Sequence, residues 1–482
     1  MYQKISGFLL KIWNNNFITL LIILLIAINF SWLTFPFYWD EAWSYAMAIF
    51  GMAESGPTLI PGHANEWFTR GHPLFFYFIA SSWLVIFGKT LLSAHVFALV
   101  VSCCSLYIIH FFCKQLFSIK VANFAALSMM VQVIFIAQSS LLLPEIFLMG
   151  LSVWVVYLYI KKKWYSFIAV SFCLILSKET ALVLFAVLFF DTVFLQKIIY
   201  RKEHKFDMTY IREIFFVIIP FLLFGIFLIV QKMNLGYFFY PEHTNLMSFS
   251  LKECMEKLSS ISNSLFISNL RYIWLCIAVP ALLVGIIKKR FLKNDIHIFA
   301  LSGIFIFAYL LFSSINFFTL RYLLTPLPFI IILYIVIISK SFSGKSGYFL
   351  IVVAILVNLY YGLVVSNGEG DCSRNFRQSV MAHKEAVNFC ESQQWHDRSI
   401  KTNFLMNFNL VYPQLGYLYN VEKPFTNCGN HEFPDIYIFY SSEYESKIDE
   451  IRSDINYELV KKIEKPNGCF VEIYEKREVI NK

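Results

Sequence analysis

Two adjacent carboxylates, Asp40 and Glu41, follow directly on the apolar run from Phe17 to Tyr38. That run has about the 20 residues that a helix needs to cross a bilayer. Carboxylates at the mouth of a membrane span are costly unless they are solvated, paired with a cation or used in a reaction. The aromatic residues around the pair also suit an interfacial belt, so this motif alone fits an interface marker and a catalytic acid equally well.

Further ionisable and aromatic residues stand between later apolar runs. They are Arg70 and His72 before Pro73, Glu145 after Pro144, Lys178 and Glu179 in a tight turn, Tyr240 and His243 in a loop, and Arg321 beside Tyr322. Each has an ordinary explanation, such as a charge favoured at a helix start, a local ion pair or a side chain extended to lipid phosphates. Together they would place carboxylates beside cations on one membrane surface. A carboxylate can deprotonate an acceptor hydroxyl and a cation can stabilise a leaving phosphate, so this set favours group transfer from a phosphate-activated lipid.

The composition excludes a soluble globular protein. The 482 residues are 58% hydrophobic and 15% charged, and apolar runs recur almost to residue 366 before the sequence turns polar. We therefore predict a membrane domain over residues 1–366 and a soluble domain over residues 367–482. The first apolar run is too long for a signal peptide, so we expect an uncleaved span. The net charge of +8 lies mostly in loops, where it indicates membrane orientation rather than nucleic-acid binding.

The apolar windows predict an α-helical polytopic protein with about eleven crossings. The expected spans are 17–38, 91–113, 121–138, 146–160, 164–177, 180–195, 214–231, 265–287, 295–315, 322–339 and 347–366. The segment from Pro73 to Gly88 is apolar but short, and the orientation of every later loop depends on whether it crosses. If it is interfacial, the basic loops all fall on one side, as the positive-inside rule requires. We therefore expect the N-terminus inside and the C-terminal domain outside.

The polar tail predicts a small α/β domain. Residues 374–392 have a helical pattern, whereas residues 400–402, 435–440 and 469–474 have the patterns of strands. Such a domain could recognise an acceptor or could be a passive cap, and its pattern does not choose between them. The tail cysteines are Cys372, Cys390, Cys428 and Cys469. In an oxidising compartment they could form two disulfides in any of three pairings.

The order of these motifs resembles that of the C-type (GT-C) integral-membrane glycosyltransferases. The matching segments are Asp40-Glu41 after a first span, Gly71-His72-Pro73-Leu74, Leu143-Pro144-Glu145, Ser177-Lys178-Glu179-Thr180 and Arg321-Tyr322-Leu323-Leu324. The similarity covers most of residues 1–340 and is greatest to the branch with protein O-mannosyltransferases and the lipid A aminoarabinose transferase. In size and in the large outer C-terminal region, the chain is also similar to phage-type serotype-converting glucosyltransferases that modify O-antigen.

The resemblance implies an inverting sugar transfer from a polyprenyl-phosphate donor, on the periplasmic face of a bacterial inner membrane. The acceptor would be a cell-envelope glycan or glycolipid such as O-antigen. Asp40 would be the general base and Glu41 would orient substrate. The implied donor-phosphate residues are Lys178, Arg321, Arg70 and His72, and the substrate-binding candidates are Glu145, Glu179, Tyr240, His243 and Tyr322.

A divalent metal is left open by the same comparison. His72 stands where the aminoarabinose branch has a phosphate-binding lysine, and Gly71 where it has a metal-binding glutamate. The missing glutamate argues against that branch's metal site, although His243 could belong to a different one.

Two functions of other classes compete with an enzyme. A transporter or flippase of lipid-linked sugars would need charged residues near the middle of the bilayer and paired or inverted repeats. A membrane scaffold would use the outer charges for partner binding alone, so conservative changes at Asp40, Lys178 and Arg321 would have no effect. The charges gather at one membrane edge and the span over residues 17–38 is uncharged, which favours the enzyme. The expected partners are then the donor lipid, the acceptor glycan and membrane lipids.

Overall fold

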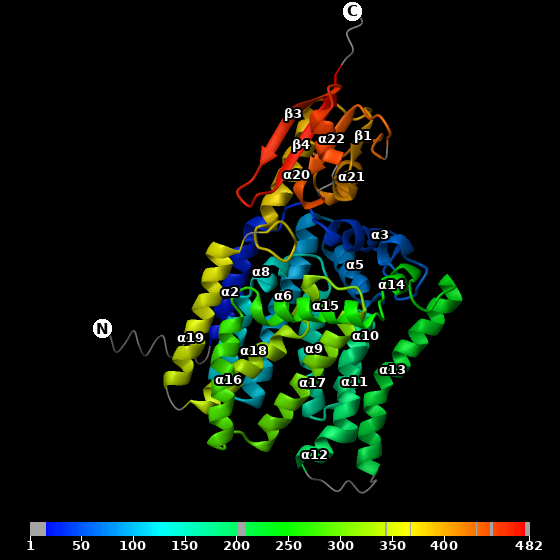
Figure 1. Ribbon diagram of the computed structural model, residues 1–482. Helices are drawn as coiled ribbons and strands as arrows, with labels where there is room; N and C mark the ends of the chain where they lie inside the picture. Colours follow the sequence, from blue (N-terminus) through cyan, green and yellow to red (C-terminus); the bar gives the residue numbers. More distant parts are fainter. Residues whose placement is uncertain are drawn as a thin grey trace, which may run out of the picture.

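The computed structural model describes residues 16–200, 208–342, 345–366, 368–429, 431–443 and 447–477. Within them, a body of long helices carries a small C-terminal domain at one end (Figure 1). Six helical stretches are long and apolar enough to cross a membrane: Leu91–Leu116, Glu179–Tyr200, Met208–Leu235, Lys293–Ile315, Leu320–Ser341 and Lys345–Val365. The helices Leu251–Ile267 and Tyr272–Ile287 are bent by 81° relative to each other. They make a seventh stretch if the pair is counted as one span. The chain is a multi-pass membrane protein.

The helices before residue 200 are α2 (Phe17–Asn29), η1 (Phe30–Trp32), η2 (Glu41–Ala46), α3 (Met47–Ser55), α4 (Glu66–Thr69), α5 (Phe75–Phe87), α6 (Leu91–Leu116), α7 (Ile119–Met130), α8 (Val133–Gln138), α9 (Glu145–Ile160), α10 (Trp164–Ile175), η3 (Glu179–Ala181), α11 (Leu182–Phe190), η4 (Asp191–Leu195) and α12 (Gln196–Tyr200). The later helices of the body are α13 (Met208–Leu235), α14 (Pro241–Asn245), α15 (Leu251–Ser262), η5 (Asn263–Ile267), α16 (Tyr272–Ile287), α17 (Lys293–Ile315), η6 (Leu320–Leu324), α18 (Leu327–Ser341), α19 (Lys345–Tyr360) and η7 (Tyr361–Val365).

Four of the eleven expected spans are shorter apolar helices. They correspond to Phe17–Trp32, Ile119–Met130, Glu145–Ile160 and Trp164–Ile175, and a fifth expected span, 265–287, is the bent pair. The apolar windows overestimated the lengths of the first two because hydropathy does not register a break in the backbone, whereas the expected span 146–160 agrees closely with Glu145–Ile160. The helix of residues 17–38 ends at Trp32, and that of 121–138 is interrupted between Met130 and Val133.

Lysines of two predicted basic loops pair with acids near the starts of membrane helices. At one end of the helical body, Lys162 after α9 pairs with Glu213 near the start of α13, and Lys340 near the end of α18 pairs with Asp295 near the start of α17 at 2.6 Å. These contacts bring predicted basic loops to a common end, as the positive-inside threading requires. Lys4, Lys11 and the basic residues of 201–207 lie outside the described residues.

The C-terminal domain contains a four-stranded sheet with helices against it. Its helices are α20 (Phe376–Ser392), α21 (Phe404–Val411), η8 (Pro413–Leu415), η9 (Ser441–Glu443) and α22 (Lys447–Ser453), and its strands are β1 (Ile400–Thr402), β2 (Ile436–Tyr440), β3 (Tyr457–Glu464) and β4 (Phe470–Lys476). The sheet order is β1-β2-β4-β3, with β1 parallel to β2 and the other pairs antiparallel. The predicted α20, β1, β2 and β4 are all present. Strand β3 was missed because it is a charged edge strand whose pairing with β4 shifts register after Leu459.

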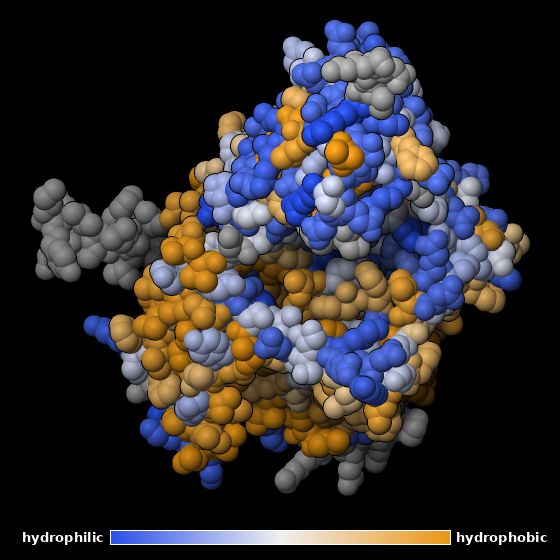
Figure 2. All heavy atoms as spheres, turned by 45° about the horizontal axis from the view of Figure 1, so that its top comes forward, coloured by the Kyte–Doolittle hydropathy of each residue, from blue (hydrophilic) through white to orange (hydrophobic). Residues whose placement is uncertain are grey.

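This domain shares a hydrophobic core with the region around Asp40. Phe37 and Tyr38 pack in the same cluster as Phe376 and Leu415. The amide of Phe37 donates to the carbonyl of Leu415 at 3.0 Å, and the Tyr38 hydroxyl donates to the carbonyl of Glu369 at 3.1 Å. The domain is therefore fixed above the residues that follow the first apolar helix. Figure 2 shows its mostly hydrophilic surface above the hydrophobic helical body.

The four tail cysteines are free thiols in the structure. Cys372 donates to Asp371 at 3.3 Å. Burial raises the pKa of the Cys390 thiol, as does the nearby Cys428. Disulfide formation among these residues stays a prediction.

Candidate active site

Asp40 stands where the chain turns sharply into a π-helix. Trp39 has the left-handed φ of 55°, and η2 begins immediately after Asp40. Trp43 lies on the first turn and its indole Nε1 donates to Asp40 Oδ1 at 2.8 Å. Burial alone would raise the pKa of Asp40, but Arg321 and the Trp43 bond outweigh it and hold the pKa below its ordinary value. Asp40 is therefore a carboxylate at neutral pH, with its side chain 22% exposed.

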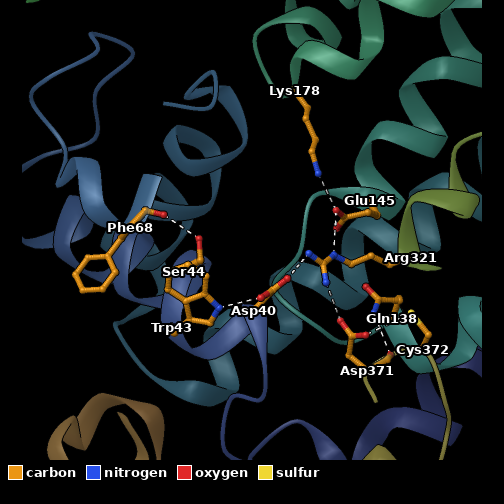
Figure 3. Close-up of polar contacts among 10 residues, drawn as sticks. All are labelled: Asp40, Trp43, Ser44, Phe68, Gln138, Glu145, Lys178, Arg321, Asp371 and Cys372. Carbon is orange, nitrogen blue, oxygen red and sulfur yellow. Dashed lines mark hydrogen bonds and ion pairs between the residues drawn. The ribbon is translucent and has the colours of Figure 1, made fainter. Parts of the chain in front are cut away.

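Arg321 joins three carboxylates that come from distant parts of the chain (Figure 3). Its Nη2 pairs with Asp40, its Nε donates to Glu145 Oε1 at 3.3 Å, and its Nη1 donates to Asp371 Oδ2 at 3.2 Å. The guanidinium is buried and uses each of its three nitrogens for a different acid. Only a planar fork of donors can hold three acids in this way.

Lys178 adds a second cation on the far side of Glu145. Its Nζ donates to Glu145 Oε1 at 3.0 Å and lies 3.9 Å from the centre of the Tyr322 ring. Glu145 Oε2 is buried and has no hydrogen-bond partner among the described residues. We call Asp40, Glu145, Lys178, Arg321 and Asp371 the Arg321 cluster.

Asp371 was missed by the sequence analysis. Burial raises the pKa of its carboxyl despite the nearby Arg321. The available signal was its position, because it is an acid a few residues beyond the last apolar run, on the side where Asp40 also lies. It was assigned to the tail domain, whereas its side chain completes a site in the membrane domain.

Glu41 faces away from this cluster. Its Oε1 accepts a hydrogen bond from the amide of Leu142 at 2.5 Å and lies 3.2 Å from Nε2 of His95, and its Oε2 accepts from the amide of Tyr38 at 3.3 Å. The carboxylate is fully buried. Glu41 thus ties the Asp40 turn to the segment that leads into Glu145.

A second polar cluster brings His72, Glu179 and His243 together. His72 Nδ1 lies 3.1 Å from Glu179 Oε2, and the two imidazole rings are 4.8 Å apart between centroids. One potential ligand atom from each residue lies within 4.8 Å of the others. Burial, followed by the nearby His72, lowers the pKa of His243 to about 4. We call these three residues the histidine cluster.

Gly71 leaves no room for the glutamate that the resemblance would put there. Its φ is +67°, and a β-carbon at this position would lie 2.9 Å from Cβ of Tyr240. A side chain would be strained and crowded. The carboxylate beside His72 is instead supplied by Glu179 from another loop.

Arg70 lies at the edge of the site. It pairs with Glu242, and its guanidinium carbon is 4.8 Å from the centre of the Trp43 ring and 5.6 Å from that of Tyr240. It therefore connects the Asp40 turn with the loop that carries His243, without joining the Arg321 cluster.

A cavity of about 310 Å³ is lined by all three residues of the histidine cluster and by Lys178 of the Arg321 cluster. Its polar wall includes His72, Lys178, Glu179, His243 and Tyr322, with Tyr240 beside them. Its apolar wall comes from membrane helices and includes Phe224, Phe227, Leu228 and Phe312. A cavity with a cationic end and an apolar end fits an amphiphile with an anionic head.

No family model matches this sequence, and no curated protein matches it significantly. Solved structures do. ArnT from Cupriavidus metallidurans in the apo state superposes with a TM-score of 0.59 at 12% identity, over 94% of this chain and 97% of that chain. The same protein bound to undecaprenyl phosphate gives 0.57 at 12% identity, with the same coverage. The archaeal oligosaccharyltransferase AglB from Archaeoglobus fulgidus, in complex with an inhibitory peptide and a dolichol-phosphate, gives 0.47 at 10% identity over 86% and 65%.

The chain has an ArnT-like fold. At 12% identity the similarity to ArnT shows a shared fold alone, and the expected resemblance is confirmed only to that extent. The C-terminal domain falls within this similarity, because 94% of the chain is covered.

Proposed function

We propose that this protein is an inverting glycosyltransferase that moves a sugar from a polyprenyl-phosphate donor to a cell-envelope glycan or glycolipid. The observation that carries the proposal is the chain of contacts from Asp40 through Arg321 and Glu145 to Lys178, which ends in the wall of the amphipathic cavity. These contacts link the Asp40 carboxylate, within one site, to the end of the cavity that would bind the phosphate. The ArnT structure bound to undecaprenyl phosphate supports a lipid of this class.

In the proposed reaction, Asp40 is the general base. Trp43 occupies one of its oxygens and Arg321 the other, and each carboxylate oxygen keeps a lone pair for an acceptor hydroxyl. The acceptor oxygen bonds to the anomeric carbon as the bond from that carbon to the phosphate oxygen breaks. The acceptor proton moves to Asp40, and the polyprenyl phosphate leaves with the bonding electron pair, so the anomeric configuration inverts.

The cavity suits the leaving lipid phosphate. Lys178 and His72 can stabilise its charge at the polar end, and the phenylalanine side chains of α13 and α17 can cover the isoprenoid chain. Glu145 holds Lys178 and Arg321 in place, because one of its oxygens accepts from both. Glu179 and Tyr322 position His72 and Lys178 at the same end.

The histidine cluster fits a divalent metal. Two imidazoles and a carboxylate are a donor set used by zinc and other first-row cations. A cation held by His72, Glu179 and His243 would add positive charge beside the phosphate-binding end.

We also place the site on the periplasmic face of a bacterial inner membrane. The basic loops that pair at the opposite end support this orientation, with the shorter apolar helices completing about eleven crossings. The test is mass spectrometry of envelope glycans from cells with and without the gene. We expect one added sugar residue on the acceptor. An identical glycan in both strains, with the protein present in the membrane, would refute the proposal.

A further inference from the structure

Helix α21 of the C-terminal domain has an unusual outer face. Its inner face buries Leu405, Met406 and Leu410, as expected for a helix packed on a sheet. Its outer face carries Phe404 and Phe408, followed by Tyr412 just after the helix end, where a solvated helix normally has polar residues. Phe404 is 42% exposed, and the other two are half-buried. An exposed aromatic side chain that is continued by half-buried aromatic neighbours on an outer helix face is a candidate binding surface.

The row continues into the candidate active site. The ring centroids of Trp43 and Phe404 are 5.1 Å apart, those of Phe404 and Phe408 are 5.3 Å apart, and those of Phe408 and Tyr412 are 5.0 Å apart. Trp43 is also the residue that hydrogen-bonds Asp40. We call Trp43, Phe404, Phe408 and Tyr412 the aromatic ladder. It leads by successive contacts from Asp40 to helix α21 of the C-terminal domain.

We infer that the aromatic ladder binds an extended glycan, the acceptor, and guides its end to Asp40. This inference rests on the proposed function and names its acceptor class. A pyranose ring has one face of C–H groups, which stacks on aromatic rings, and a rim of hydroxyls that need hydrogen bonds. Successive rings about 5 Å apart suit successive sugar units of an extended chain better than a compact ligand.

The polar groups near the ladder favour a glycan over a lipid tail. Arg70, which is paired with Glu242, stacks on Trp43 at the start of the ladder, and Trp43 hydrogen-bonds the partly exposed Asp40 carboxylate. An acyl chain would desolvate these charged groups without a new hydrogen bond, whereas sugar hydroxyls can hydrogen-bond them.

The test measures polysaccharide binding by the full chain purified in detergent. The probe is delipidated polysaccharide released from the envelope of cells that carry the gene. We expect Phe404→Leu and Phe408→Ala each to weaken binding about fivefold, the size of effect that one aromatic contact gives. The matched control is Tyr419→Ala, because Tyr419 is a 92% exposed aromatic of the same domain outside the ladder. It should bind within about twofold of wild type.

Three outcomes decide the inference. Weaker binding by both ladder variants, with the control unchanged, supports it. Equal binding by wild type and ladder variants, including no binding by any of them, overturns it. If the ladder variants lose binding to phosphatidylethanolamine–phosphatidylglycerol vesicles and keep polysaccharide binding, the inference is overturned in favour of a lipid contact. Phe404→Leu keeps an apolar side chain at an exposed position, so it should fold even if Phe408→Ala does not.

Asp40→Asn separates this inference from the proposed function. If Asp40→Asn binds polysaccharide normally but does not transfer sugar, both stand. If transfer depends on Asp40 while the ladder variants bind like wild type, the ladder inference alone fails. If Asp40→Asn transfers sugar at the wild-type rate, the proposed function fails, whatever the ladder binds.

Discussion

The guanidinium of Arg321 pairs with the carboxylate of Asp40, although 281 positions separate the two residues in the chain. Arg321 also holds Glu145 and Asp371, so one side chain fixes acids from three segments. The position of the candidate base therefore depends on Arg321 in η6 and on Asp371 just beyond η7. Replacing Arg321 should therefore disturb the site more than replacing any one of the three acids that it holds.

Replacing Arg321 with lysine should abolish transfer. The three donors of an ammonium leave a single nitrogen, so a lysine cannot reach three carboxylates that are spaced to match the three separate nitrogens of the Arg321 guanidinium. We expect at least about a 100-fold loss of kcat/KM, together with a lower thermal stability, since breaking a buried ion pair costs about 3–5 kcal/mol. The measurement is sugar transfer and thermal unfolding of the purified variant.

Arg271→Lys is the matched control. Arg271 is also buried, but it donates to the backbone carbonyls of Ser264 and Ser268, away from the Arg321 cluster. Its variant should lose stability and keep its transfer rate per folded molecule. Equal transfer rates of Arg321→Lys and Arg271→Lys would contradict the proposed role of Arg321.

Transfer should persist to acidic pH. The pKa of Asp40 is held below its ordinary 3.8, so the base form is present from neutral pH down and is lost only as pH falls through that lowered value. Trp43→Phe removes one hydrogen bond to the charged carboxylate, which raises the pKa. The acid limb of kcat/KM should therefore move to higher pH. A limb that stays in place, or moves to lower pH, would exclude Asp40 as the titrating base.

Filling the apolar wall of the cavity should impair use of the donor. Leu228→Trp adds a bulky ring to a residue that lines the cavity, and we expect KM for a polyprenyl-phosphate donor to rise about 10-fold. Ile226→Trp, on the same helix but 59% exposed on the outer surface, is the control and should leave KM unchanged. Steady-state kinetics with varied donor would show the difference. Equal KM values for both variants would place the donor elsewhere.

The histidine cluster should retain a divalent metal on purification. Elemental analysis of the purified chain should find about one metal ion per chain. His72→Ala and His243→Ala should each lower that content at least about tenfold. His63→Ala is the control, since His63 is an exposed histidine outside the cluster. Equal metal content in all three variants would argue against a metal at these residues.

Sidedness was predictable from the sequence because it depends on where charges fall along the chain. Asp40, Glu145, Lys178 and Arg321 were expected on one side, and the structure brings their side chains into contact. Composition could not predict the direction in which each side chain points. Glu41 is adjacent to Asp40, yet a π-helix turns it into the core, where it binds the Leu142 amide. Neighbouring residues on such a turn point to different surroundings.

Long-range packing explains the other differences. Asp371 follows the last apolar run and gave no local pattern, and its part in the site exists only because the C-terminal segment returns to Arg321. Phe404, Phe408 and Tyr412 were not singled out by the sequence analysis. The meaning of this row depends on Trp43, more than 350 positions earlier, lying at its end.

The most direct test of the central claim is sugar transfer by Asp40→Asn. Asparagine keeps the size and a hydrogen-bonding oxygen but cannot accept the acceptor's proton, so the protein should still accumulate in the membrane while transfer falls at least about 1,000-fold. The measurement is the mass of the envelope glycan in cells producing equal amounts of wild type and variant. The added sugar should be present with the wild type and missing with Asp40→Asn. A variant glycan that carries the sugar at the wild-type level would contradict the assignment of Asp40 as the base.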